Sequence, residues 1–182
     1  MSEIMLDIET LGLSSNSVVM TIGAIKFNRK DDIKAVEDME NFYCRVSKES
    51  CIALGLEIDK ETEDWWGKQS EEAKYEIFTN NKNRYSIKDA LINLTAFIGN
   101  CKIIWANGIT FDCVILENCY KKCNLDFPWK YYNLRDARTI YDIGKVNLKH
   151  FSSDKNQAHN ALYDCYTQIK ALKKSFDNLK NI

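Results

Sequence analysis

The chain has 182 residues, of which 45% are hydrophobic and 28% charged, with a formal net charge of −1. This is the composition of a soluble globular protein, and the length favours one domain over residues 1–182. No apolar run reaches the roughly 20 residues that cross a bilayer, which argues against a membrane partner, and binders that use backbone electrostatics alone are usually more basic.

The N-terminal half is predicted to begin with three strands, at residues 3–8, 18–27 and 41–47. A turn rich in Gly, Ser and Asn separates the first two strands, and a charged turn separates the next two. A charged helical pattern follows over residues 59–79. A second helix is predicted over residues 86–100, because Ser86 is a suitable N-cap and apolar residues follow it at helical spacing.

The C-terminal half alternates strands and helices. It contains a short buried strand at 102–107, a helix at 110–123, a short strand that runs into a helix within 131–143, and a long helix at about 160–178. Three successive strands followed by this alternation predict an α/β fold with helices packed on a sheet.

The first strand contains two acids, Asp7 and Glu9, within the segment DIETLG. Residues i and i+2 of a strand point to the same face, so these carboxylates emerge side by side with Met5, while Ile4, Leu6 and Ile8 take the other face. Adjacent, partly buried carboxylates repel unless a cation lies between them. A divalent cation is one explanation; two solvated acids at a strand end are the other.

Another acid, Asp112, follows a strand-to-helix turn that contains Asn107 and Gly108. Ligands of open α/β sheets gather at strand ends, which suggests a role in a site. An acid in the first turn of a helix is also favourable by itself, through the helix dipole.

The last motif is HNALYD, in which His159 precedes Asp164 by five residues. The two side chains converge best if His159 lies in the loop before the helix and Asp164 in its second turn. A structural histidine and an acid on the flank of the apolar stripe are the alternatives.

Together, the order D-x-E, D, H-x-x-x-x-D resembles the three motifs of the DnaQ-like (DEDDh) 3′–5′ exonucleases. The resemblance covers about residues 4–170 and is nearest to the branch of phage exonuclease A and bacterial exoribonuclease-like domains, through TEDWWGKQSEEAK, WANGITFD and NLRDARTIY. It implies a ribonuclease-H-like mixed sheet, with three antiparallel strands and then parallel strands, flanked by helices.

The resemblance also implies a two-metal hydrolysis of phosphodiester bonds at the 3′ end of single-stranded DNA or RNA, releasing nucleoside 5′-monophosphates. Asp7 would hold both ions, Glu9 and Asp164 would complete one site, and Asp112 would hold the second ion. His159 would be the general base. Oxygen ligands of this kind suit Mg²⁺ or Mn²⁺.

Substrate contacts follow by the same analogy. Thr10 and Leu11 would contact the last nucleotide, with Leu11 wedged against its base, and Asn107 and Phe111 would line the same pocket. Leu11 replaces the second threonine of D-x-E-T-T-G, and the stretch before Asp112 is longer than N-x-x-F-D. Both departures alter the rim that grips the nucleotide.

Several basic and aromatic residues are further candidates for substrate contacts, and most of them also have a purely structural interpretation. Trp65 and Trp66 could stack on a base or belong to the core. Arg138 is a candidate phosphate contact, and Arg135 with Asp136 a candidate ion pair. Lys145 and Lys149 could supply positive charge near the third motif, or form a solvated loop.

The seven cysteines include no C-x-x-C pair, and the N-terminus lacks a signal peptide pattern. Both observations favour reduced thiols and a cytoplasmic protein. Cys119 and Cys123 lie one helical turn apart and would be either a metal pair or buried thiols.

The main alternative function is a non-catalytic nucleic-acid-binding module on the same fold, which predicts a decayed set of acids. A structural protein with coincidental acids and an endonuclease of the same fold group are further alternatives. Many members of the resembled family pair as dimers, so a homodimer is left open. No residue decides between DNA and RNA.

Overall fold

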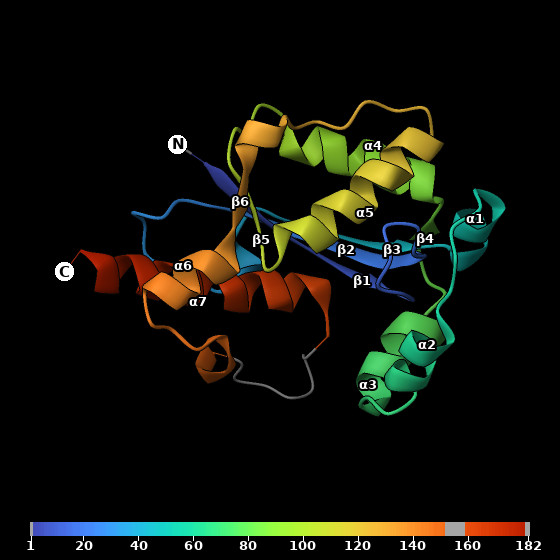
Figure 1. Ribbon diagram of the computed structural model, residues 1–182, viewed down its shortest axis with the longest axis horizontal. Coiled ribbons are helices and arrows are strands. Elements are labelled where there is room, and N and C mark those ends of the chain that lie inside the picture. The colour runs from blue at the N-terminus through green and yellow to red at the C-terminus, as the bar shows by residue number, and fades with distance from the viewer. Residues whose placement is uncertain (1, 152–158, 181–182) are drawn as a thin grey trace.

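The computed structural model describes residues 2–151 and 159–180, so residues 1, 152–158 and 181–182 of the expected 1–182 domain lie outside the described part. Six strands form one sheet in the order β4-β3-β2-β1-β5-β6 (Figure 1). The strands are β1 (Glu3–Thr10), β2 (Val19–Phe27), β3 (Asn41–Val46), β4 (Arg84–Tyr85), β5 (Ile104–Ala106) and β6 (Leu134–Asp136).

The sheet is mixed. β1 pairs with β2, and β2 with β3, in antiparallel fashion, whereas β5 runs parallel to β1 and β6 parallel to β5. The short edge strand β4 pairs with β3 in parallel. Three antiparallel strands followed by parallel strands are the predicted arrangement, and the α/β fold class is confirmed.

The helices lie between and after the strands. The α-helices are α1 (Lys48–Ala53), α2 (Lys60–Trp66), α3 (Glu71–Lys74), α4 (Ile87–Ile98), α5 (Ile109–Lys122), α6 (Ala137–Ile143) and α7 (Ala161–Leu179). Short 3₁₀-helices are η1 (Val36–Asp38), η3 (Tyr131–Asn133) and η4 (Leu148–Phe151), and η2 (Tyr75–Thr79) is a π-helix.

The charged helical pattern predicted over residues 59–79 is divided in the structure among α2, α3 and η2. Gly67 ends α2, and the Ser70 side chain accepts the N–H of Ala73 and thereby begins α3. A capping serine inside a charged helical pattern starts a new helix, since it satisfies N–H groups that have no partner within the helix. α1 and β4 were not predicted.

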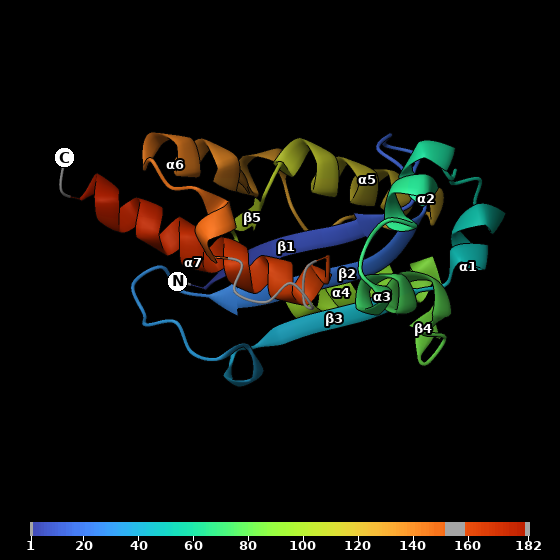
Figure 2. The same cartoon turned by 90° about the horizontal axis from the view of Figure 1, so that it is seen from below.

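Helices cover both faces of the sheet (Figure 1). One core contains Ile4, Leu6 and Ile8 with residues of α4 and α5, and it also contains Cys119 and Cys123. The other core contains Met5 with residues of α6 and α7. The side chains of β1 therefore alternate between two cores, as its sequence predicted. Figure 2 shows α7 crossing one face of the sheet, with α4 behind the strands.

The N-terminus of α7 lies directly on β2 at Gly23. A Cβ atom at Gly23 would come within 2.4 Å of the carbonyl carbon of Ala161, so this contact requires glycine. Gly23 is paired with Asp7 across the two strands, and the close approach therefore brings the first turns of α7 over the acids of β1. Among the described residues, no helix combines the length and apolar character that crossing a bilayer requires.

Candidate active site

The five motif residues line one pocket of about 430 Å³. It opens where β1 and β5 end, next to the N-termini of α5 and α7. The acids are Asp7 and Glu9 from β1, Asp112 from α5 and Asp164 from α7, and the histidine is His159. The other lining residues are Ile8, Asn107, Phe111, Arg138, Leu148, Thr167 and Gln168. The structure thus brings together all five residues that the motifs singled out.

A hydrogen bond from the free edge of β1 holds the Asp112 side chain in place. β5 pairs with β1 only as far as Met5, so the edge of β1 beyond that point has no neighbouring strand. The Oδ1 atom of Asp112 accepts the N–H of Ile8 there, at 3.2 Å. Because Ile8 lies between Asp7 and Glu9, this bond holds a third carboxylate, itself 3% exposed, beside the first two.

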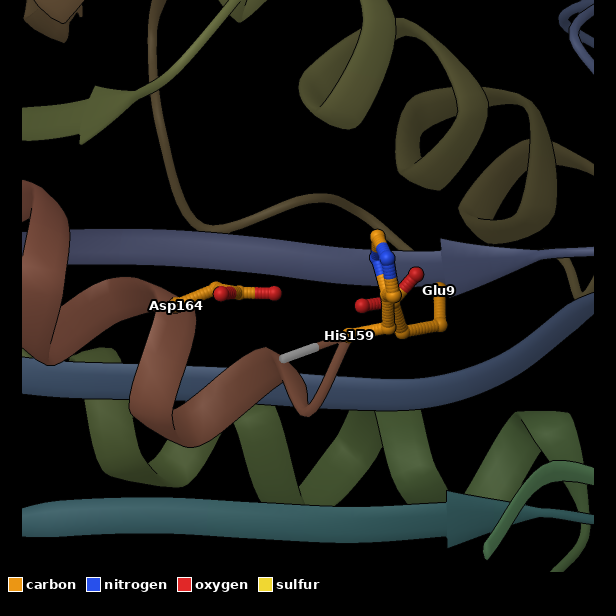
Figure 3. A group of neighbouring side chains, drawn as sticks. All are labelled: Glu9, His159 and Asp164. Atoms are coloured by element: carbon orange, nitrogen blue, oxygen red, sulfur yellow. The ribbon is translucent and has the colours of Figure 1, made fainter. Parts of the chain in front are cut away.

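His159 and Asp164 approach β1 from the start of α7 (Figure 3). Asn160 caps this helix by accepting the N–H groups of Leu162 and Tyr163. His159 precedes the cap with a φ of +63°, in the left-handed region. Glu9, His159 and Asp164 each offer one ligand atom, and these atoms lie within 4.8 Å of one another.

The acids raise one another's proton affinity. Burial, followed by the charges of Asp112 and Asp164, raises the pKa of Asp7 well above its ordinary value, and burial followed by Asp164 and Asp112 does the same for Glu9. Burial also raises the pKa of Asp112 to about 7 and that of Asp164 to about 6. Carboxylates that disfavour each other's charge in this way form an arrangement that a cation would stabilise.

The donor set fits a hard divalent cation. The pocket is lined by four carboxylates and one imidazole, and Arg138 is the only lysine or arginine among the described residues that line it. Such oxygen-rich sites suit Mg²⁺ or Mn²⁺. Among the described residues, Glu9, His159 and Asp164 are the one group of three or more side chains placed to hold a metal ion. Cys119 and Cys123 are buried in the core.

A second pocket, of about 420 Å³, adjoins the first and shares Ile8, Glu9 and Phe111 with it. Its wall is largely apolar and aromatic. Its other lining residues are Thr10, Leu13, Asp59, Glu61, Thr62, Trp65 and Trp66. The two tryptophans differ: Trp65 is 43% exposed, whereas Trp66 is 1% exposed and donates its indole N–H to the carbonyl of Thr10 at 2.9 Å.

Contrary to the prediction, the structure does not place the Leu11 side chain where it could wedge against a base. The Leu11 side chain is fully buried in the core and lines neither pocket, and its backbone N–H donates to the carbonyl of Val18. Thr10 lines the second pocket, but its hydroxyl donates to the carbonyl of Gly12 at 2.7 Å. Leu13, which the motifs did not single out, is 74% exposed and lines the second pocket instead.

Hydrogen bonds from the start of α6 and its N-cap support the turn before Asp112. The carboxylate of Asp136 accepts the N–H of Ile109 at 2.9 Å, and Arg138 donates its Nε–H to the Asn107 side chain at 3.2 Å. The expected ion pair of Arg135 with Asp136 does not form, because Arg135 donates to the carbonyls of Tyr132 and Leu134. Asn107 and Phe111 both line the acid pocket as expected.

The expected basic contribution from residues before the third motif is not at the pocket. Lys145 and Lys149 are exposed, and neither lines it, whereas Leu148 does. Among the described residues, Arg138 is the basic side chain at the pocket, and it lowers the pKa of Asp112 against the larger effect of burial, which raises it.

Comparison with known proteins agrees with this geometry. A family model described as the 3′–5′ exoribonuclease Rv2179c-like domain matches residues 2–176. An exodeoxyribonuclease of Enterobacteria phage T4 is 25% identical over an alignment of 207 residues. The match covers 95% of this chain and 88% of that protein. The crystal structure of cell-death related nuclease 4 (CRN-4) matches with a TM-score of 0.52 and 13% identity. That match covers 97% of this chain and 64% of the nuclease, and it shows a shared fold.

Proposed function

The chain belongs to the family of 3′–5′ exoribonuclease Rv2179c-like domains, within the DnaQ-like exonucleases, and from this premise we propose that it removes nucleotides from the 3′ end of single-stranded nucleic acid. The products would be nucleoside 5′-monophosphates. The observation that carries the proposal is the convergence of four carboxylates and one histidine, from three distant segments, on one pocket.

The carboxylates would hold two divalent cations, Mg²⁺ or Mn²⁺. Asp7 would serve both ions, Glu9 and Asp164 would complete one site, and Asp112 would hold the second. Bound in this way, the ions would supply charge stabilisation for both the attacking and the leaving oxygen of an in-line displacement at phosphorus.

His159 is suited to remove a proton from the attacking water. Burial lowers the pKa of His159 and thereby favours the neutral imidazole, the form that can accept a proton. The ring is also held in place: Trp65 lies edge-on to it at 4.9 Å and Trp66 at 5.8 Å between centroids. A neutral, fixed imidazole beside Glu9 and Asp164 is what general-base catalysis requires.

The last nucleotide would lie across the two adjoining pockets. Its base would enter the aromatic pocket between Trp65, Leu13 and Phe111, where stacking tolerates any base. Its phosphate would face the acids, with Arg138 as a cation that lines the same pocket. We assign no residue to the 2′-hydroxyl, so the proposal covers DNA and RNA.

The test is digestion of matched 5′-labelled single-stranded DNA and RNA oligonucleotides with Mg²⁺ or Mn²⁺. We expect a descending ladder that shortens from the 3′ end and disappears on chelation. Asp7→Asn should give no ladder, and His159→Ala should give a metal-dependent ladder about 10²–10⁴-fold more slowly.

Two outcomes would overturn the proposal. Internal cleavage without a ladder would indicate an endonuclease, and binding of the oligonucleotide without any cleavage would indicate a non-catalytic module. An activity that Asp7→Asn retains in full would remove the assignment of the acids.

A further inference from the structure

Gln168 occupies an unusual position for a glutamine. It lies on α7 one turn after Asp164, is 3% exposed, and lines the acid pocket. Its Nε2 atom donates to Oδ1 of Asp7 at 2.7 Å, across 161 positions of the sequence. This bond connects α7 directly to the acid that the proposed function makes central.

Packing alone does not explain a glutamine here. Its neighbours on the buried face of α7 are Cys165, Ile169 and Leu172, which belong to the apolar core. The side-chain oxygen of Gln168 is buried and has no hydrogen-bond partner. Burying an amide with one end unsatisfied is unfavourable, so an aliphatic residue would serve the fold at least as well.

The backbone at Gln168 is also fixed. The Tyr141 hydroxyl, from α6, donates to the backbone carbonyl of Gln168 at 3.0 Å. The main chain at Gln168 is thus held by α6, while the side-chain amide reaches β1. One end of the amide orients a carboxylate, and the other end is an unused acceptor inside the same group of residues.

We propose that Gln168 is a positioning residue that fixes the Asp7 carboxylate for divalent-cation binding. Its Nε2–H occupies one direction at Oδ1 and so restricts rotation of the carboxylate, and its Oε1 is available to a donor that enters with the cation or the substrate. This inference rests on the proposed function, since it assigns Gln168 a role in the same site. Hydrogen-bonding partners behind metal ligands typically contribute 10- to 100-fold in metal affinity or activity.

The experiment measures Mn²⁺ affinity directly, by titration of the free-ion electron paramagnetic resonance signal. The variants are Gln168→Met, which keeps the length and removes both polar atoms, and Gln168→Asn, which keeps the amide and shortens its reach. Ser175→Ala is the matched control, because Ser175 is buried on the same helix and its hydroxyl bonds the carbonyl of Ala171, away from the pocket.

We expect both Gln168 variants to bind Mn²⁺ about 10- to 100-fold more weakly than the wild type, and Ser175→Ala to bind as the wild type does. Excess Mn²⁺ should restore cleavage by the variants, with the oligonucleotide KM unchanged. A merely structural role would instead lower the unfolding temperature of the metal-free protein and leave the metal affinity unaltered.

The outcomes separate this inference from the proposed function. If the wild type binds Mn²⁺ and both variants bind it within twofold of the wild type, the positioning role is overturned and the nuclease proposal stands. If the wild type itself does not bind Mn²⁺, both are overturned. Should Gln168→Met fail to fold, the same measurement on Gln168→Asn decides.

Discussion

The indole of Trp65 meets the imidazole of His159 edge to face, with their ring centroids 4.9 Å apart and their planes at 81°. Trp65 therefore faces two ways, toward the proposed general base and into the aromatic pocket beside it. Its neighbour in sequence, Trp66, has the same indole side chain in a different environment. Trp66 is buried and donates its indole N–H to the backbone of β1.

The same substitution is therefore predicted to lower activity at Trp65 and stability at Trp66. Trp65→Ala should lower kcat/KM about 10- to 100-fold, because stacking of an aromatic side chain on a base contributes about 1–3 kcal/mol, and should change stability little. Trp66→Ala should destabilise the fold by about 3–5 kcal/mol. Oligonucleotide digestion and urea unfolding measure the two effects. Tyr131→Ala, at an aromatic residue that is 87% exposed and lines neither pocket, is the control.

Asp7 is expected to contribute to activity at the expense of stability. Burial, and then the charges of Asp112, Asp164 and Glu9, raise the pKa of Asp7, so its ionised form is disfavoured in the metal-free protein. Asp7→Asn removes this charge and retains an oxygen that can accept the N–H of Gln168.

We therefore predict that Asp7→Asn abolishes cleavage and raises the unfolding temperature in the presence of a chelator. A gain of about 1 kcal/mol would correspond to about 2–4 °C in a chain of this size. Differential scanning calorimetry measures the shift. A variant less stable than the wild type under these conditions would contradict the electrostatic interpretation.

The two faces of β1 could be predicted from the sequence because they depend on local periodicity. Alternation along β1 separated Met5, Asp7 and Glu9 from Ile4, Leu6 and Ile8, and the two cores of the structure follow that separation. The start of α7 was expected near residue 160, with His159 before it, and the cap at Asn160 agrees.

Leu11 shows where the same rule fails. Strict alternation would place Leu11 on the face of Asp7 and Glu9. Leu11 lies just past the end of β1, and the pairing of β1 with β2 already shifts register between Glu9 and Thr10, with the extra residue on the β2 side, so the alternation of β1 does not extend to Leu11. Leu11 consequently joins the core of Ile8, and Leu13 becomes the exposed leucine of the second pocket. No local pattern in the sequence marks this shift.

Gln168 could not have been assigned from the sequence for a different reason. Its spacing on α7 predicts only that it borders the buried face of the helix. Its bond to Asp7 depends on how closely α7 approaches the sheet, which Gly23 on another strand determines. Contacts of this kind are set by packing between distant segments, and one sequence does not encode them in any short motif.

The raised pKa values predict how metal-free stability depends on pH. Asp112, with a pKa of about 7, and Asp164, with a pKa of about 6, bind protons more tightly in the folded chain than at their ordinary value of 3.8. Between about pH 4 and pH 7 the folded state therefore holds more protons than the unfolded state, so their contribution to stability is present at low pH and is lost as the pH rises.

We accordingly expect the unfolding temperature in a chelator to fall more steeply over this window for the wild type than for Asp112→Asn. Because a cation must displace these protons, Mn²⁺ affinity should increase over the same range. Thermal unfolding and Mn²⁺ titration at pH 5, 6, 7 and 8 measure both effects. Parallel pH curves for the two proteins would show that Asp112 does not titrate in this window.

Arg138 and Arg135 provide a matched test of the phosphate contact. They lie three positions apart at β6 and the start of α6, and both are exposed. Arg138 lines the acid pocket and donates to Asn107, whereas Arg135 donates to backbone carbonyls outside it. A guanidinium that lines the acid pocket can bind the phosphate of the last nucleotide without competing for the cations.

Arg138→Ala should therefore raise the KM for an oligonucleotide about tenfold, and should reduce the slope of log affinity against log salt by about 1, as expected for the loss of one phosphate contact. Arg138→Lys should recover part of the affinity, because lysine keeps the charge and loses the planar pair of donors. Arg135→Ala should leave both quantities as in the wild type. Equal effects of the two alanine variants would mean that general surface charge, rather than a contact at the pocket, attracts the substrate.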